Sequence, residues 1–114
     1  MVVRQWAPER GDLVWLTLDP HTGREQSRRR PALVLSPGAY NSKTGLAVIC
    51  PISSHTKGYP FEVPLPKDLP VEGAILSDHL KSVDWKERRG AFIGRVRPET
   101  LTAVLNRVGP LLGF

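Results

Sequence analysis

Four arginines and one glutamate crowd the stretch between Gly23 and Pro31, and their side chains suit the binding of phosphate. The last of them, Arg30, lies just ahead of the apolar run Ala32–Leu35, which we expect to be a buried strand. A charged group at the start of a strand is held in place, unlike one in mid-linker. Guanidinium groups match phosphate oxygens and stabilise the charge of a phosphoryl transition state. The sequence therefore predicts a phosphate-handling site that contains Arg24, Glu25, Arg28, Arg29 and Arg30.

Composition limits the classes of protein to consider. The 114 residues carry 16 Lys and Arg against 11 Asp and Glu, a net charge of +5. This excess favours a polyanionic or acidic partner, although many ordinary domains are equally basic. The single Cys50 excludes an intrachain disulfide and a cysteine metal cluster, and its apolar neighbours predict a buried hydrophobe rather than a nucleophile.

The sequence also predicts where in the cell the protein is found. No apolar run approaches the roughly 20 residues that a membrane-spanning helix needs. The N-terminal MVVRQWAPER has no hydrophobic core and no cleavage site of a secretion signal. We therefore expect a cytoplasmic protein with no membrane association.

Short apolar runs separated by turn residues predict a mainly β protein. We expect strands at 13–18, 32–36, 46–52, 61–65, 73–76 with a continuation at 80–83 after a break, and 91–96. The run 61–65 carries prolines on one alternation and is predicted to be an edge strand. The run 13–18 is apolar on both alternations, so either sheet curvature or another subunit must cover it.

Two helical segments complete the pattern. Ser36 as N-cap and Pro37 as first helical residue predict one turn over 38–41, followed by a turn at 41–45. A closing helix begins at Pro98, repeats apolar residues from Leu101 to Val108 at helical spacing, and is expected to stop at Gly109–Pro110. Together these elements predict one domain over residues 1–114, a small barrel of strongly bent antiparallel strands with short helices and a C-terminal helix.

Five segments in order resemble the MazF/PemK family of toxin endoribonucleases: GDLVWLTLDP, GREQSRRRPALVLSP, YNSKTG, CPISSHTKGYPFEV and DHLKSVDW. The resemblance covers nearly the whole chain. It implies an SH3-like barrel of the MazF/CcdB type, a homodimer, and sequence-specific cleavage of single-stranded RNA without metal or cofactor. It also implies a cognate acidic antitoxin, similar to MazE, whose C-terminal tail covers the RNA groove.

Metal-free RNA cleavage uses the 2′-OH as an internal nucleophile on the adjacent phosphorus. The products are a 2′,3′-cyclic phosphate, or its hydrolysed 3′-phosphate, and a 5′-OH. The protein must accept the 2′-OH proton, protonate the leaving oxygen and stabilise the added negative charge.

The resemblance assigns three catalytic residues. Arg30 matches the family's catalytic arginine and, being permanently charged, suits charge stabilisation rather than base catalysis. Ser53 occupies the family's Thr or Ser position and would hold the scissile phosphate, or it is merely a turn hydroxyl that caps its own loop. Glu25 accepts the 2′-OH proton or only orients Arg30, and the sequence does not separate these roles.

Further residues are expected to bind RNA rather than to react. Arg29 is expected to attract RNA by charge alone. The three histidines lack the spacing of a metal site, and base contact is favoured over proton transfer for His55 and His79. The predicted RNA-binding residues are Asp19, His21, Gly23, Arg24, Arg28, Ser54, His55, Lys57, Asp78, His79 and Lys81.

Two other functions stay open on the sequence. One is a gyrase-poisoning toxin on the same barrel, without a catalytic site and indifferent to Arg30. The other is a basic SH3-like module that binds RNA or an acidic peptide without chemistry.

Overall fold

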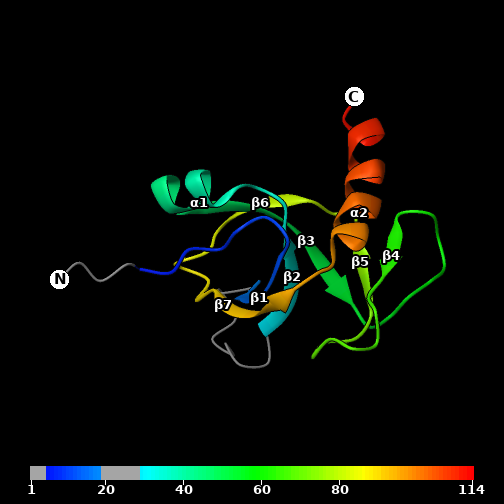
Figure 1. Ribbon diagram of the computed structural model, residues 1–114, viewed down its shortest axis with the longest axis horizontal. Helices are drawn as coiled ribbons and strands as arrows, with labels where there is room; N and C mark the ends of the chain where they lie inside the picture. Colours follow the sequence, from blue (N-terminus) through cyan, green and yellow to red (C-terminus); the bar gives the residue numbers. More distant parts are fainter. Residues whose placement is uncertain (1–4, 19–28) are drawn as a thin grey trace.

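The computed structural model describes residues 5–18 and 29–114, which fold into one bent antiparallel sheet and two helices (Figure 1). The predicted strands are all present, with ends shifted by a few residues. The elements in chain order are β1 Asp12–Thr17, β2 Arg29–Val34, α1 Gly38–Thr44, β3 Leu46–Ser53, β4 Glu62–Pro64, β5 Ala74–Leu76, β6 Lys81–Asp84, β7 Ala91–Arg95 and α2 Pro98–Leu111.

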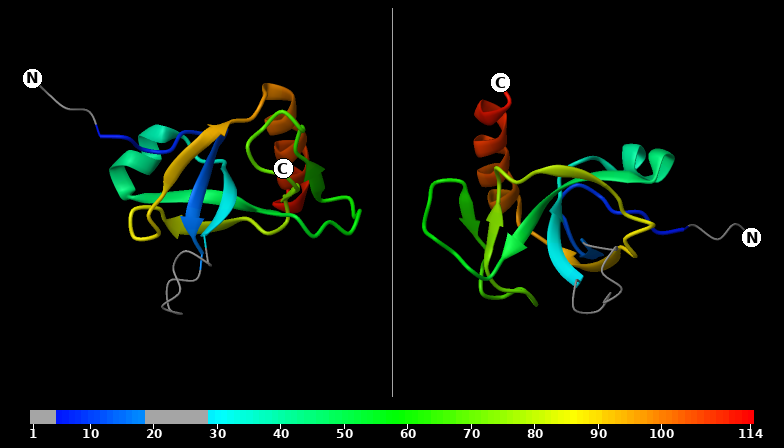
Figure 2. Two further views of the ribbon diagram at one scale, coloured as in Figure 1. Left: turned by 90° about the horizontal axis from the view of Figure 1, so that it is seen from below. Right: turned by 180° about the vertical axis from the view of Figure 1, so that it is seen from behind.

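The long strand β3 organises the sheet, whose order is β4-β5-β3-β2-β1-β7. Its C-terminal end pairs with β5, and its N-terminal half pairs with β6. The segment predicted as one strand with a break at 77–79 therefore forms two strands, β5 and β6, which both pair with β3. β4 and β7 lie at the two ends of this order and, within the described residues, do not pair with each other, so the strongly bent sheet stays open rather than closing into a barrel (Figure 2). The position of β4 at one end confirms the predicted edge strand.

Hydrophobic residues pack on both sides of the bent sheet. One cluster contains Leu13, Leu33 and Cys50 together with Val104 of α2, and the other contains Val14, Leu16 and Ile49 among others. Alternate residues of β1 thus face different clusters, as strand geometry requires. Both faces of β1 are covered by this chain itself, so sheet curvature is the correct alternative and no second subunit is needed there.

The helix α1 differs from the prediction at both ends. Ser36 is not an N-cap: its hydroxyl donates to Asn41 Oδ1 at 2.6 Å and accepts from the Val48 N–H at 2.8 Å. The helix begins after Pro37 and runs to Thr44, through the segment predicted as a turn. Gly45 ends it with φ +73°, a conformation that glycine adopts without strain.

The helix α2 starts at Pro98 as predicted but extends past the predicted stop, to Leu111. Pro110 sits inside its last turn. Proline removes only its own N–H from the hydrogen-bond ladder, and the Leu112 N–H still bonds to the Val108 and Gly109 carbonyls. Neither helix within the described ranges is long and apolar enough to cross a membrane.

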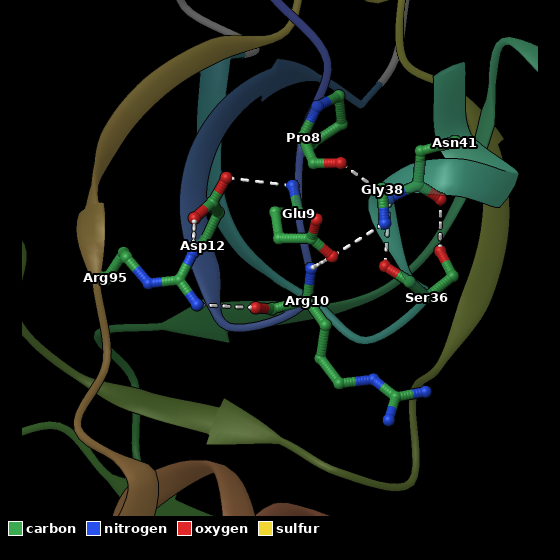
Figure 3. Close-up of polar contacts among 8 residues, drawn as sticks. All are labelled: Pro8, Glu9, Arg10, Asp12, Ser36, Gly38, Asn41 and Arg95. Carbon is green, nitrogen blue, oxygen red and sulfur yellow. Dashed lines mark hydrogen bonds and ion pairs between the residues drawn. The ribbon is translucent and has the colours of Figure 1, made fainter.

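A polar network ties the chain before β1 to α1 and β7 (Figure 3). Fully buried Asn41 donates to the carbonyls of Pro8 and Ser36 at 2.8 and 2.9 Å. The Glu9 carboxylate accepts from the N–H groups of Gly38 and Arg10, and these bonds lower its pKa. Figure 3 also shows the ion pair of Asp12 with Arg95, at 2.7 Å.

Replacing Asn41 by alanine is expected to lower the free energy of unfolding by about 3 kcal/mol, because buried carbonyls would lose their donors. Urea unfolding measures this loss. Ser42→Ala is the matched control, since its exposed hydroxyl makes only a 3.4 Å bond to the Ala39 carbonyl; we expect a change within about 0.5 kcal/mol. Equal stability of the two variants would contradict a stabilising role for the network.

Candidate active site

A groove of about 780 Å³ opens between the start of β2, the end of β3 and the loop before β5. It combines arginines, hydroxyls and an imidazole with apolar walls. The lining residues are Trp15, Leu18, Arg29, Arg30, Pro31, Pro51, Ile52, Ser53, Ser54, His55, Leu69, Pro70, Val71, Glu72 and Leu76.

Sheet register brings Arg30 and Ser53 to this groove from different strands. The β2–β3 pairs are Ala32 with Pro51, Leu33 with Cys50 and Val34 with Ile49. Arg30 stands two residues before Ala32 and Ser53 two residues after Pro51, just beyond the last pair of this ladder, and both line the groove. The exposed guanidinium of Arg30 donates to the Arg29 carbonyl at 3.0 Å.

The Ser53 hydroxyl holds its own loop. It accepts from the His55 N–H at 3.0 Å, while among the described residues its own proton has only the His55 carbonyl at 3.5 Å, the outer limit of a hydrogen bond. The turn-hydroxyl alternative therefore describes a real contact. It leaves the hydroxyl oriented by a strong bond and its proton weakly used, which suits donation to a bound phosphate oxygen.

Gly73 packs directly behind Ser53 and was not among the predicted site residues. Its φ is +126°, and a Cβ there would lie 2.2 Å from the Ser53 carbonyl oxygen and 2.8 Å from the carbonyl carbon. Only glycine fits such a close approach. The sequence does show a glycine at the start of an apolar strand. It does not show that this glycine packs against Ser53, which lies on a different strand.

Arg29 has a structural role that the sequence did not predict. Its guanidinium donates to the Arg88 and Arg89 carbonyls at 3.2 and 2.7 Å and to the Thr17 hydroxyl at 3.3 Å. Arg88 in turn donates to the carbonyls of Thr17 and Leu18. Both chain ends that flank residues 19–28 are thus fixed to the turn before β7.

The other predicted site residues fall into three groups. Ser54 and His55 line the groove. Lys57, Asp78, His79 and Lys81 do not line it. Several predictions lie outside the described residues: Asp19, His21, Gly23, Arg24, Glu25 and Arg28.

Asp78 and His79 instead form a cluster with Tyr59. The Tyr59 hydroxyl donates to Asp78 Oδ1 at 2.8 Å and lies 3.4 Å from His79 Nε2. The bond to Asp78 raises the pKa of Tyr59, because ionisation would remove the proton that makes this bond. Within the described ranges, no three His, Cys, Asp or Glu side chains are grouped as metal ligands.

Cys50 is buried, and burial raises its thiol pKa to about 12. A thiol of that pKa is almost wholly protonated at neutral pH and is a poor nucleophile. The prediction of a small buried hydrophobe is confirmed.

The fold and groove define a small, mainly β protein with a basic, hydroxyl-bearing groove that suits a phosphodiester. The family described as "PemK-like, MazF-like toxin of type II toxin-antitoxin system" matches residues 9–112. The chain belongs to this family of toxin endoribonucleases. The resemblance noted from the sequence is confirmed, and the family assignment favours an enzyme over the gyrase poison and the binding module.

Individual relatives agree with this assignment. The endoribonuclease toxin MazF of Escherichia coli K12 is 41% identical over 98% of this chain and 100% of its own. The crystal structure of MazF from Deinococcus radiodurans has 49% identity and a TM-score of 0.88, covering 96% of this chain and 100% of that one. A MazE–MazF complex from the same organism has 45% identity and a TM-score of 0.87, covering 96% and 99%. The predicted fold class is thereby confirmed, with an open sheet.

Proposed function

We propose that this toxin cleaves single-stranded RNA at a short sequence by attack of the 2′-OH on the adjacent phosphorus, without a metal ion. The observation that carries the proposal is the groove that Arg30 and Ser53 both line, in a chain of the MazF/PemK family. The P–O5′ bond breaks as the P–O2′ bond forms, and the departing O5′ takes up a proton as the 2′-OH gives up its own. The products are a 2′,3′-cyclic phosphate and a 5′-OH.

Each step needs a group from this chain. Arg30 donates to the non-bridging oxygens as charge builds on them, and Ser53 fixes the phosphate through its weakly used proton. Glu25 either accepts the 2′-OH proton or orients Arg30. RNA bases and phosphates beyond the scissile bond contact Asp19, His21, Gly23, Arg24, Arg28, Ser54, His55, Lys57, Asp78, His79 and Lys81.

The proposal includes partners. We infer that residues 1–114 form one toxin domain that assembles as a homodimer. Support comes from apolar side chains left exposed at the end of α2, where Leu112 is 56% and Phe114 is 93% exposed. A cognate acidic antitoxin is inferred from the relatives solved as MazE–MazF complexes, and the basic charge of this chain favours such a partner. We infer that the toxin acts in the cytoplasm, because mRNA, its proposed substrate, is found there.

Incubation of the purified protein with a long single-stranded RNA in EDTA tests the reaction. Discrete fragments with 5′-OH and cyclic or 3′-phosphate ends are expected. Intact RNA would overturn the cleavage proposal. Cleavage that depends on added Mg²⁺ and leaves 5′-phosphates would overturn the metal-free mechanism.

A further inference from the structure

We propose that Glu72 is a specificity-determining residue, which selects a base with an exocyclic amino group at one position of the RNA. The inference rests on the proposed cleavage of RNA and adds a chemical criterion for its sequence. It assigns a role to a carboxylate that the cleavage chemistry does not use.

Glu72 is the one acidic side chain among the described residues that line the groove. It is exposed and, within the described part of the chain, makes no hydrogen bond or ion pair. Arg29, which also lines the groove, already donates to the Arg88 and Arg89 carbonyls. The carboxylate therefore keeps its acceptor capacity for a ligand.

The backbone on either side holds Glu72 relative to the candidate catalytic serine. Gly73 lies against the Ser53 carbonyl, and its own carbonyl accepts from the Leu65 N–H at 2.9 Å. Ala74 pairs with Ser53 in the sheet, and Val71 is buried. A carboxylate on such a segment meets the same part of the RNA in every complex.

A carboxylate in a groove for a polyanion repels phosphate and accepts hydrogen bonds only. This repulsion is offset when an RNA base donates a hydrogen bond to the carboxylate. Cytosine, adenine and guanine carry amino groups on the edges that single strands expose, whereas uracil carries two carbonyls that flank its one donor, N3–H, and these carbonyls repel a carboxylate. Glu72 thus discriminates against uracil at the position it faces.

Cleavage-site mapping on a mixed RNA pool, with wild type and Glu72→Gln, tests the inference. Wild type is expected to exclude uracil at one position by about tenfold. The amide both donates and accepts, so Glu72→Gln should accept uracil there while other positions keep their preferences. Cleavage rates on two oligonucleotides that differ only by cytosine or uracil at that position quantify the change.

The control is Glu99→Gln, which makes the same charge change at the start of α2, away from the groove lining; its preferences should equal those of wild type. Unchanged preferences in Glu72→Gln, at whatever rate, would overturn the inference while leaving RNA cleavage intact. RNA left uncut by wild type would instead overturn the proposed function, and this inference with it.

Discussion

Replacing Arg30 by alanine is expected to reduce the rate of RNA cleavage by at least about 10²–10³-fold, the usual effect of losing one charge-stabilising donor. The exposed guanidinium lines the groove together with Ser53, so no buried packing is lost with it. The fold and antitoxin binding should be retained. Single-turnover cleavage of a defined oligonucleotide measures the effect, with thermal unfolding and antitoxin titration alongside.

Two further variants separate chemistry from general charge. Arg97→Ala removes the same charge from an exposed pair with Asp68 that does not line the groove, and it should cleave at close to the wild-type rate. Arg30→Lys keeps the charge but loses the planar fork, so its rate should fall between wild type and Arg30→Ala. Near-normal cleavage by Arg30→Ala would remove Arg30 from the mechanism.

Much of the fold could be predicted because strand signals are local. Apolar runs bounded by turn residues located every strand, and the break at 77–79 matched two separate strands on β3. Predictions from local sequence were wrong where a polar side chain bonds to residues elsewhere in the fold instead of to its own helix end. Ser36 has the residue type of a helix cap, but its hydroxyl bonds to Asn41 and Val48 inside a buried network.

The groove was predictable in part for the same reason. Arg30 and Ser53 adjoin predicted strands, and strand ends are fixed points once the register is known. Arginine type alone does not reveal the partner: Arg29 looked like an RNA contact but donates to backbone carbonyls. Asp78 and His79 follow a strand next to the groove, yet they turn to Tyr59.

Replacing Gly73 by alanine is expected to reduce both stability and cleavage, because the site behind Ser53 has no room for a side chain. At φ +126° an alanine is strained by about 1–3 kcal/mol. Its Cβ would also overlap the Ser53 carbonyl, so one of the two segments must move. A displacement of about 1 Å at the reacting groups costs on the order of 10²-fold in rate.

Gly58→Ala is a control for the positive φ. Gly58 has φ +78°, a less demanding left-handed conformation, and open space around a Cβ. It should lose about 1 kcal/mol of stability and keep its cleavage rate. Urea unfolding and single-turnover rates, taken where both variants are fully folded, give the comparison. A Gly73→Ala protein with the wild-type cleavage rate would show that Ser53 tolerates the overlap.

A double-mutant cycle distinguishes a positioning role of Gly73 from simple destabilisation. If Gly73→Ala acts by moving the Ser53 hydroxyl, it should cost little additional rate in a Ser53→Ala background, because the displaced group is already absent. A general loosening of the groove would lower the rate by the same factor in both backgrounds. Strong non-additivity would also support catalysis by Ser53, since moving a hydroxyl that only capped its own loop would leave cleavage unchanged.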